Sequence, residues 1–356
     1  MTVDQRQFHN VLVVRTDRIG DVVLSLPMIS LVRSHLPMAR ISMLLRECTR
    51  ELAEGYEGID EVLTYDHQGK PKPFFGFLSE LRRGRFDLVV VAHPTFRLGL
   101  LISLARIPVR VGTGYRWYSF LFNRRVFEHR KTAEKHEAEY NLSLLQSIGW
   151  SWSGVTSATL TPGRSATLAA KKARQELGLG DSEPMVVLHP GSGGSARDWS
   201  AQNFGSLAKL LNADGIRVVV TGIAQEESLV QTVVEGSGGV AIPLIGRLSL
   251  MELAAFLRSA DLFVSNSTGP LHIAAAVGVP VIGFYPPIRE CSAKRWGPLT
   301  QQKVVFVADN QACARCRGGE CQGDDCMDQI TVEQVLHAAR GLIASFREQP
   351  VVRASL

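Results

Sequence analysis

NVLVVRTDRIGDVVLS, residues 10–25, predicts the start of a parallel α/β unit. Its first part, residues 10–15, is a β-branched apolar run typical of a buried strand. A polar loop follows, and residues 21–36 then carry apolar side chains at helical spacing. Residues 40–45 predict the next buried strand. A strand, a helix and a further strand in this order indicate a doubly wound sheet with parallel strands.

The same alternation continues along the chain and restarts once. In the first series, a further strand is expected at 86–92, followed by an apolar helix, and then a strand at 109–112 and an amphipathic helix at 136–148. The second series is expected to contain strands at 185–189, 217–221, 261–265 and 280–285, and helices at 201–212, 228–234, 251–258 and 270–277. A last amphipathic helix is expected at 331–346.

A segment rich in Ser, Thr, Gly and Pro, residues 151–165, separates the two series. We therefore expect two doubly wound domains, at residues 1–165 and 166–330. Residues 331–356 are expected to form a C-terminal helix that packs back on the first domain. Because ligands of such sheets bind beyond the carboxyl ends of the strands, the loops at those ends are where chemistry is expected.

Composition and charge narrow the class of protein. The chain has 356 residues, of which 45% are apolar and 21% charged, as in an ordinary globular protein. No apolar run reaches the ~18 residues that a membrane span needs, and the polar start lacks a signal-peptide core. A cytoplasmic location is therefore expected. No zinc-finger, RRM or helix-turn-helix signature favours a nucleic-acid partner.

The positive charge is concentrated in the first half of the chain. Residues 1–180 contain 25 Lys and Arg against 17 Asp and Glu, whereas residues 181–356 contain 14 against 17. A basic half is suited to an anionic partner, such as a phosphorylated lipid or an acidic membrane surface. The alternative is that the excess arginines only form a solvated surface.

The first motif is the loop TDRIGD, residues 16–21, at the end of the first strand. It concentrates Asp17, Arg18 and Asp21, which suits acid–base chemistry or the binding of an acceptor. Asp21 stands at the start of the predicted helix, where the helix dipole favours its charged form. The competing interpretation is that Asp17 or Asp21 merely caps the helix.

The second motif is SNSTGPLH, residues 265–272, where another predicted strand runs into a helix. Pro270 suits the first helical position and Thr268 or Gly269 the N-cap. Free backbone N–H groups beside small side chains form an anion site that fits a phosphate. His272, in the first turn, is placed to reach the same anion; the alternative is a buried, hydrogen-bonded histidine.

The third motif is HPGSGGSARDWS, residues 189–200. It formally contains the dinucleotide fingerprint G-x-G-x-x-A. The helix does not open at the loop, however, because residues 197–200 intervene, and the next strand ends without an acid to hold a ribose. A glycine loop carrying Ser192 and Arg197 fits a sugar diphosphate better than a dinucleotide.

These three motifs, in this order, resemble glycosyltransferase family 9, the heptosyltransferases. Residues 10–25 look like the family's amino-terminal signature, residues 187–199 like its central HPG loop, and residues 262–283 like its carboxyl-domain signature. Residues 313–330, CARCRGGECQGDDCMDQI, are similar to a Cys-containing tail of many members.

The resemblance implies a GT-B fold, in which two Rossmann-like doubly wound domains face each other across a cleft. It implies that the first domain binds the acceptor and the second the nucleotide sugar. The implied reaction is inverting transfer of a heptose or a related sugar from an ADP-sugar to a lipopolysaccharide core acceptor, with no metal or other cofactor required. The implied partners are the ADP-sugar, an anionic lipid-linked oligosaccharide and the anionic inner face of the inner membrane.

The resemblance also assigns roles to residues of this chain. The general base maps to Asp21, and Asp17 and Arg18 lie beside it on the acceptor side. The contacts to the donor map to Ser192, Arg197, Glu226, Ser267, Thr268, Gly269 and His272. Of these, Glu226 is the residue expected near the nucleotide ribose.

One position departs from the family pattern. Many heptosyltransferases have Asp where this chain has Ser267, and that Asp helps to hold the heptose or its nucleotide. Three alternatives therefore stay open. They are a transferase that uses another nucleotide sugar or acceptor, a nucleotide-sugar epimerase of GT-B shape, and a binder of sugar nucleotides or nucleic acid without catalytic activity.

Four cysteines form the pattern C-x₂-C-x₄-C-x₄-C: Cys313, Cys316, Cys321 and Cys326. Four thiols this close together have the ligand set of a tetrahedral structural Zn²⁺ site. Stable disulfides are disfavoured in a reducing cytoplasm. The alternative to a metal site is that the thiols are simply reduced, or paired only opportunistically.

Overall fold

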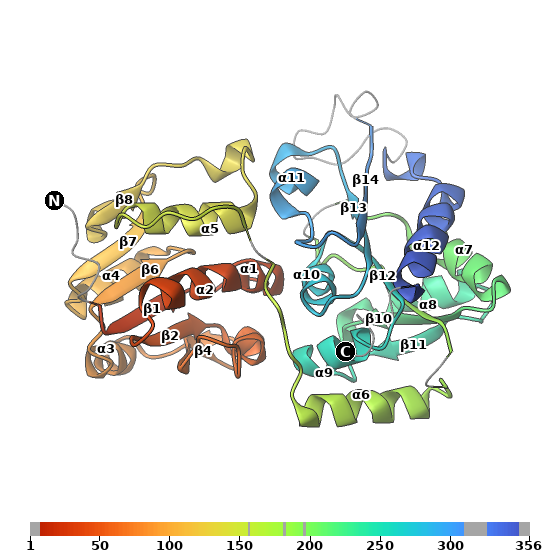
Figure 1. The fold of residues 1–356 in the computed structure, drawn as a ribbon, viewed down its shortest axis with the longest axis horizontal. Coiled ribbons are helices and arrows are strands. Elements are labelled where there is room, and N and C mark those ends of the chain that lie inside the picture. The colour runs from red at the N-terminus through yellow and green to blue at the C-terminus, as the bar shows by residue number, and fades with distance from the viewer. Residues whose placement is uncertain (1–7, 156, 181–182, 195–196, 310–325, 349–356) are drawn as a thin grey trace. The chain divides into compact units, whose positions relative to one another are not determined.

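The computed structural model describes residues 8–155, 157–180, 183–194, 197–309 and 326–348. The chain divides into two compact units, Met1–Ala158 and Thr159–Leu356. Each unit contains one six-stranded sheet whose strands all run parallel (Figure 1). The division falls within the Ser- and Thr-rich segment at which the sequence predicts it, seven residues before the expected boundary.

The first sheet has the strand order β3-β2-β1-β6-β7-β8. Its strands are β1 (Asn10–Val14), β2 (Arg40–Leu45), β3 (Glu61–Thr64), β6 (Leu88–Val91), β7 (Val109–Thr113) and β8 (Arg124–Val126). A two-stranded antiparallel ribbon joins β4 (Asp66–His67) to β5 (Lys70–Pro71). The helices are α1 (Ile19–Val23), α2 (Leu26–His35), α3 (Phe74–Arg83), α4 (Phe96–Leu104) and α5 (Glu137–Gln146), with 3₁₀ turns η2 (Glu47–Leu52), η3 (Ser119–Leu121) and η4 (Arg130–Thr132).

The central strand β1 is buried on both faces, as its continuous apolar run predicts. Leu12 and Val14 belong to the core beneath α3 and α4, while Val11 and Val13 point to the opposite face. Val11 pairs with Ile41 of β2 on one side and Leu88 of β6 on the other. The strand order therefore reverses between β1 and β6, which is where ligands of doubly wound sheets bind.

The helix expected at residues 21–36 is two helices. α1 ends at Val23, and α2 starts at Leu26 after a break at Leu24 and Ser25. Pro27 occupies the first turn of α2 and has no N–H group to donate to the carbonyl of the preceding turn. The break leaves α1 as a short segment that begins within the predicted acceptor loop and contains Asp21.

The second sheet has the order β11-β10-β9-β12-β13-β14, and it reverses between β9 and β12. Its strands are β9 (Met185–His189), β10 (Arg217–Gly222), β11 (Ile242–Ile245), β12 (Leu262–Asn266), β13 (Val281–Tyr285) and β14 (Lys303–Val307). The α-helices are α6 (Arg164–Glu176), α7 (Ala201–Ala213), α8 (Glu227–Gly236), α9 (Leu250–Leu257), α10 (Gly269–Ala276), α11 (Ala293–Trp296) and α12 (Val332–Arg347). Short 3₁₀ turns lie at η5 (Ala224–Glu226), η6 (Arg289–Cys291) and η8 (Cys326–Gln329).

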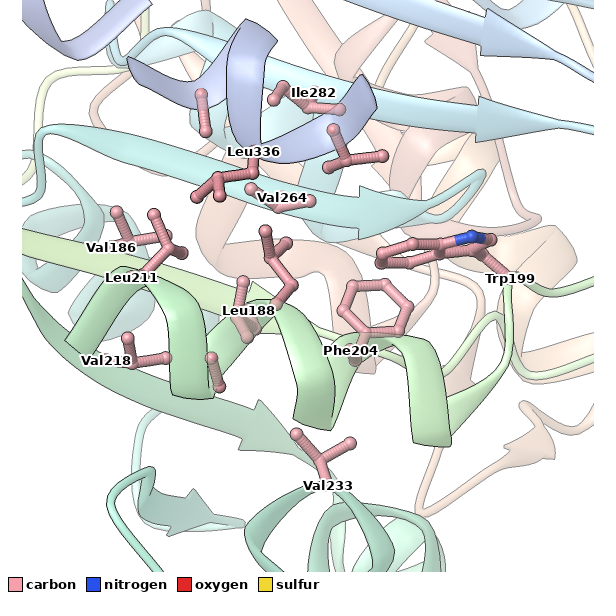
Figure 2. Packing of buried hydrophobic residues seen from close by; sticks show 14 of the residues in the cluster. Val186, Leu188, Trp199, Phe204, Leu211, Val218, Val233, Val264, Ile282 and Leu336 are labelled. Atoms are coloured by element: carbon pink, nitrogen blue, oxygen red, sulfur yellow. The ribbon is translucent and has the colours of Figure 1, made fainter. Parts of the chain in front are cut away.

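One face of this sheet packs against α7 and α12 (Figure 2). Leu188 and Val264 point from the strands toward Phe204 of α7 and Leu336 of α12. The indole of Trp199 stacks on Phe284 with the ring centroids 4.5 Å apart. The side chain of Trp199 is fully buried, so the third sequence motif is anchored in the core of the second unit.

The C-terminal helix corrects one prediction. The sequence interpretation placed residues 331–356 back on the first domain, but α12 packs within the second unit. Val335 and Ala339 are buried in that unit's core, and Arg347 binds Asp261 through a pair of 2.9 Å hydrogen bonds. The apolar stripe of the helix fits the face of the second sheet beside α7, which the prediction did not consider.

Candidate functional site

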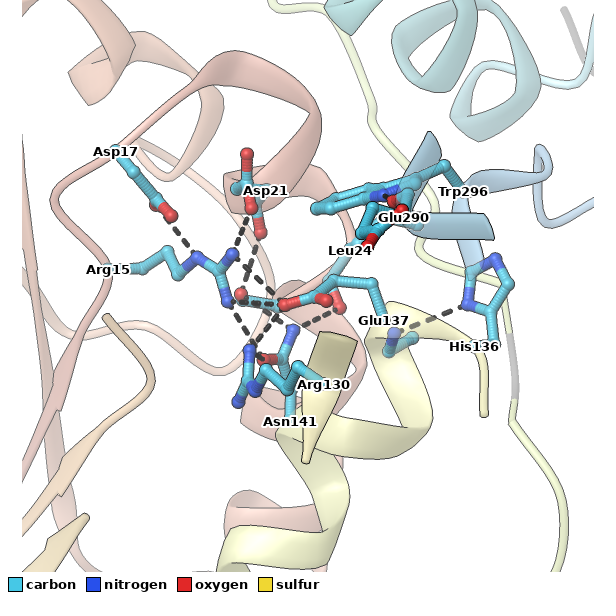
Figure 3. Close-up of polar contacts among 12 residues, drawn as sticks. Arg15, Asp17, Asp21, Leu24, Arg130, His136, Glu137, Asn141, Glu290 and Trp296 are labelled. Atoms are coloured by element: carbon cyan, nitrogen blue, oxygen red, sulfur yellow. Dashed lines mark hydrogen bonds and ion pairs between the residues drawn. The ribbon is translucent and has the colours of Figure 1, made fainter. Parts of the chain in front are cut away.

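The first candidate site is a charged network around Arg15, directly after β1 (Figure 3). The Arg15 guanidinium is 2% exposed and donates from Nε to Asp17, at 2.8 Å, and from Nη2 to Asp21. Its Nη1 donates to Asn141 at 2.9 Å and to Glu137 at 3.2 Å. Both of these partners come from α5, more than 120 residues along the chain.

A second arginine and an amide complete the network. Arg130 donates to the carboxylate of Glu137, which is itself buried. The side-chain amide of Asn141 donates to the Leu24 carbonyl and to the Ser25 hydroxyl, both at 3.1 Å. These bonds connect α5 to the break between α1 and α2, so the position of Asp21 is fixed by two elements far apart in sequence.

Asp21 has the electrostatic environment of a proton acceptor. The pKa of its carboxyl is raised to about 6, chiefly by burial and also by the neighbouring carboxylates Asp17 and Glu137, against the lowering effect of the Arg15 charge. Three carboxylates share two guanidiniums, those of Arg15 and Arg130. A carboxyl group with a pKa near the working pH is suited to general base catalysis.

The structure places the other predicted acceptor residues next to Asp21. Arg18 occupies the N-cap position of α1 and is exposed, and its side chain does not cap the helix. Asp21 lies in the first turn and binds Arg15, and Asp17 also binds Arg15. Neither aspartate therefore acts as the N-cap, the alternative that the sequence left open.

His93 is a site residue that the sequence did not single out. It follows β6, the strand beside β1, and therefore stands at the point where the strand order reverses. Its Nδ1 is buried and has no hydrogen-bond partner among the described residues. Burial lowers the pKa of the imidazole, and the positive charge of Arg15 lowers it further. A neutral ring with a free nitrogen at this point can bind a hydroxyl group of a ligand.

The second candidate site lies at the carboxyl ends of β9, β10 and β12. His189 contacts the Thr221 hydroxyl through Nδ1, at 3.0 Å, and that hydroxyl also bonds the Leu188 carbonyl at 3.2 Å. The Nε2 of His189 lies 4.0 Å from the Glu226 carboxylate, and burial lowers the pKa of this histidine.

Glu226, predicted near the nucleotide ribose, lies against the HPG loop. A Cβ atom added at Gly191 would come within 2.0 Å of the Glu226 carboxylate. Only glycine at residue 191 allows this approach. The Ile223 amide also donates to Glu226, at 3.0 Å, which fixes the carboxylate at the end of β10.

Asn266 ties the HPG loop to the end of β12. Its side-chain oxygen accepts from the Trp199 amide at 2.7 Å, and its amide group donates to the Pro190 carbonyl at 2.7 Å. Asn266 is fully buried, so these bonds are shielded from water. The two ends of the loop that carries Ser192 and Arg197 are therefore held by one side chain.

The start of α10 lies one residue earlier than the sequence predicts, since Gly269 is the first helical residue and Pro270 the second. Thr268 is the N-cap, its side chain does not cap the helix, and Gly269 and Pro270 open the first turn. His272 is buried, at 4% exposed. The Ser267 side chain hydrogen-bonds the hydroxyl of Tyr285, whose pKa is raised by burial.

The predicted cysteine site falls largely outside the described residues, which include Cys326 but none of its three expected co-ligands. Cys326 is 1% exposed and packs in the apolar core of the second unit. Among the described residues there is no cluster of His, Cys, Asp and Glu that could hold a metal ion. In the same part of the chain, no helix combines the length and apolarity that a bilayer crossing requires.

Comparison with known proteins identifies the family. The model of glycosyltransferase family 9 (heptosyltransferase) matches residues 75–326, more than half of the chain. This chain belongs to glycosyltransferase family 9. It is therefore a glycosyltransferase, and its two Rossmann-like units are those of the GT-B fold.

Individual relatives of this family 9 enzyme support the assignment. A Haemophilus influenzae protein described as a putative glycosyltransferase is 29% identical over 82% of this chain and 86% of its own length. Lipopolysaccharide heptosyltransferase 3 of Escherichia coli K12 is 27% identical, over 91% of this chain and 95% of its own. The solved structure of E. coli ADP-heptose lps heptosyltransferase II superposes with a TM-score of 0.78 at 20% identity, covering 95% of this chain and 99% of that one.

Proposed function

We propose that this family 9 glycosyltransferase moves a heptose from ADP-heptose to a lipopolysaccharide core acceptor, with inversion at the anomeric carbon. Among the relatives that cover more than nine tenths of the chain are lipopolysaccharide heptosyltransferase 3 and ADP-heptose lps heptosyltransferase II of E. coli. The observation that carries the proposal is the position of Asp21, which lies in the helix that follows β1, beside the point where the strand order reverses, and is hydrogen-bonded to the buried Arg15.

On the acceptor side, we assign Asp21 as the general base. Inversion by a single displacement requires that the acceptor hydroxyl lose its proton as the new glycosidic bond forms. Asp21 would take that proton, and Arg15 would hold the carboxylate in place through its hydrogen bond. We assign Asp17, Arg18 and the free nitrogen of His93 to binding of the acceptor.

On the donor side, the diphosphate would bind at the start of α10 and the HPG loop. The N–H groups of the first helical turn, the hydroxyl of Thr268 and the side chain of His272 supply hydrogen bonds, and Arg197 supplies positive charge. These groups would stabilise the departing ADP, so the proposed mechanism requires no metal ion. Glu226 and Ser192 would contact the ribose and the phosphates.

The identity of the donor sugar depends in part on Ser267. This serine replaces the aspartate that the resemblance leads one to expect, and its side chain bonds Tyr285. A hydroxyl group still accepts and donates hydrogen bonds, so we retain ADP-heptose as the proposed donor. The same geometry would also accommodate a related ADP-sugar, which is the principal alternative.

The proposed acceptor and location are based on the distribution of charge along the chain. The amino-terminal half carries the basic excess of the chain, which suits an acceptor bearing phosphates and carboxylates. We propose that the enzyme works at the cytoplasmic face of the inner membrane, where it contacts anionic lipid.

A donor panel tests this proposal. The enzyme would be incubated with a deacylated core oligosaccharide and with ADP-heptose, ADP-glucose or UDP-N-acetylglucosamine, and the oligosaccharide analysed by mass spectrometry. We expect a mass increase of one heptose from ADP-heptose alone. Transfer only from another nucleotide sugar would contradict the proposed donor, and an epimerised nucleotide sugar without transfer would contradict the proposed reaction.

A structural metal at the cysteine cluster is a separate proposal. Cys313, Cys316, Cys321 and Cys326 have the ligand types of a closed zinc site, although the buried Cys326 would have to turn out of its apolar packing. Elemental analysis of protein purified without chelator tests it. About one zinc per chain would support the site, whereas metal-free protein with all six cysteines reactive toward a thiol reagent would contradict it.

A further inference from the structure

Exposed aromatic side chains gather in the connection between β7 and β8 and directly after β8. We define the aromatic–basic surface by these residues and the cations between them: Tyr115, Arg116, Trp117, Phe120, Arg125, Phe127 and Lys131. Trp117 is 73% exposed, Phe120 66% and Phe127 60%. Because the strands are parallel, the residues that directly follow β7 and β8 share the sheet edge at which Asp21 lies.

These aromatic rings are held in defined positions. The Trp117 ring stacks on Phe96 with the centroids 4.8 Å apart, and Tyr115 stacks on His129 at 3.7 Å. Tyr115 also meets Phe127 edge-on at 5.6 Å. A Cβ atom at Gly114 would come within 2.3 Å of the Phe127 ring, so the glycine allows that ring to lie against the backbone. The local structure thus keeps large apolar groups in contact with water, although burying each would be favourable.

The surroundings of the rings are strongly basic. Residues 115–131 contain five Lys and Arg and one acidic residue. Arg116, Arg125 and Lys131 form no ion pair with any other residue that the structure describes. Their charge is therefore available to an external anion, and long cationic side chains beside exposed rings are typical of a surface that contacts lipid headgroups.

We propose that the aromatic–basic surface docks this enzyme on an anionic lipid bilayer. Tryptophan and phenylalanine rings partition into the headgroup and acyl boundary, while nearby Lys and Arg side chains are attracted to the negative charge of an anionic leaflet. The proposal rests on the proposed function, because an acceptor linked to lipid is presented at a membrane surface. Docking through this edge would bring the loop that carries Asp21 to the surface in which such an acceptor is anchored.

Vesicle sedimentation tests the surface. The double variant Trp117→Ser/Phe120→Ser and the charge variant Arg116→Gln/Arg125→Gln/Lys131→Gln would be compared with wild type on vesicles of phosphatidylglycerol and phosphatidylethanolamine. Met38→Ser is the matched control, because Met38 is 95% exposed and lies before β2, at the opposite edge of the sheet. We expect each multiple variant to bind at least about tenfold more weakly, and the control to bind as wild type does. Phosphatidylcholine vesicles should bind poorly in all cases.

Turnover of a water-soluble, deacylated acceptor separates docking from catalysis. We expect the double variant to keep wild-type kcat and KM on this acceptor, which also shows that it is folded. Unchanged binding of anionic vesicles by both multiple variants would overturn the proposal. A double variant with unchanged vesicle binding and a raised KM for the deacylated acceptor would also overturn it, because the rings would then contact the sugars of the acceptor. Surface-dependent binding by an enzyme that transfers no heptose would contradict the proposed function and support the docking site.

Discussion

At the scale of single residues, the account depends on Asp21. Replacing it by asparagine keeps the shape of the side chain and removes its capacity to accept a proton. Asp21→Asn should lower kcat by ~10²-fold or more, because a general base contributes roughly 10²–10⁴. The dissociation constant of ADP should be nearly unchanged. Asp17→Asn, on the same loop, should mainly raise the KM for the acceptor. Asp21→Asn turnover above half of the wild-type value would contradict the assignment.

The pH dependence of turnover follows from the pKa of the same group. Asp21 must be ionised to act as a base, and burial raises its pKa to about 6. The kcat/KM for the acceptor should therefore rise with pH through about 6 and level off above it. A pH–rate profile between pH 4.5 and 8.5 measures this. A profile that is flat across this range would show that the ionisation of Asp21 does not control the reaction.

The stability of the folded protein should respond to the ionisation of Asp21 in the opposite direction from turnover, and fall as pH rises. Its folded pKa of about 6 lies above the ordinary value of 3.8, so the folded state binds more protons and loses stability as pH rises between these values. Asp21→Asn mimics the protonated form, so at pH 8 it should raise the free energy of unfolding by roughly 2–3 kcal/mol. The gain should vanish below about pH 4. Urea unfolding at pH 8 and pH 4 measures both values.

Asp60→Asn is the control, because the pKa of Asp60 is shifted in the opposite direction, below its ordinary value. Burial opposes the shift at Asp60, but hydrogen bonds from the Ile41 amide and from Arg33 lower its pKa. This carboxylate therefore contributes stability above its ordinary pKa, and the contribution is lost as pH falls through the folded value. Asp60→Asn should destabilise the protein at pH 8 and have little effect in acid. Destabilisation by Asp21→Asn at pH 8 would show that the ion pair with Arg15 outweighs the cost of burial.

At the scale of the elements, Asn266 connects the end of β12 to the HPG loop. Asn266→Ala would leave the buried Trp199 amide and Pro190 carbonyl without this partner, at about 1–3 kcal/mol for each unsatisfied group. We expect a lower melting temperature and an ADP dissociation constant raised at least about tenfold. Asn203→Ala is the control, since its side-chain amide bonds Asp328, at 3.4 Å, and no other side chain among the residues that the structure describes. Unchanged ADP affinity in Asn266→Ala, by calorimetry, would show that the loop is not part of the donor site.

The elements also show what a sequence can and cannot predict. Strands such as β1 and β9 are continuous apolar runs between turn residues, and the loops after them were found because parallel strands end at a common edge. The partners of Arg15 on α5 were not found, because Glu137 and Asn141 are brought to it by tertiary packing across more than 120 residues. The sequence did not single out His93, because one histidine after a strand matches no sequence motif. Six short strands and three helices were also not predicted: β3, β4, β5, β8, β11, β14, α3, α6 and α11.

At the scale of the whole molecule, the chain contains two units with the same sheet architecture. Both sheets have the same strand order, and each reverses at its centre, which is where ligands of doubly wound sheets bind. In the first unit this edge carries a buried carboxylate with a raised pKa, and in the second a glycine loop and a helix start. This division is what transfer between two substrates requires, because one site must deprotonate an acceptor while the other stabilises a departing diphosphate.

The stereochemistry of the product tests this account most directly. The reaction of ADP-heptose with deacylated core oligosaccharide would be followed by proton NMR in the presence of a chelator of divalent metals. The account predicts release of ADP together with a new glycosidic bond whose anomeric configuration is opposite to that of the donor. A bond of retained configuration would contradict a single displacement with Asp21 as the base. Conversion of the nucleotide sugar to an epimer, with no glycosidic bond formed, would contradict glycosyl transfer itself.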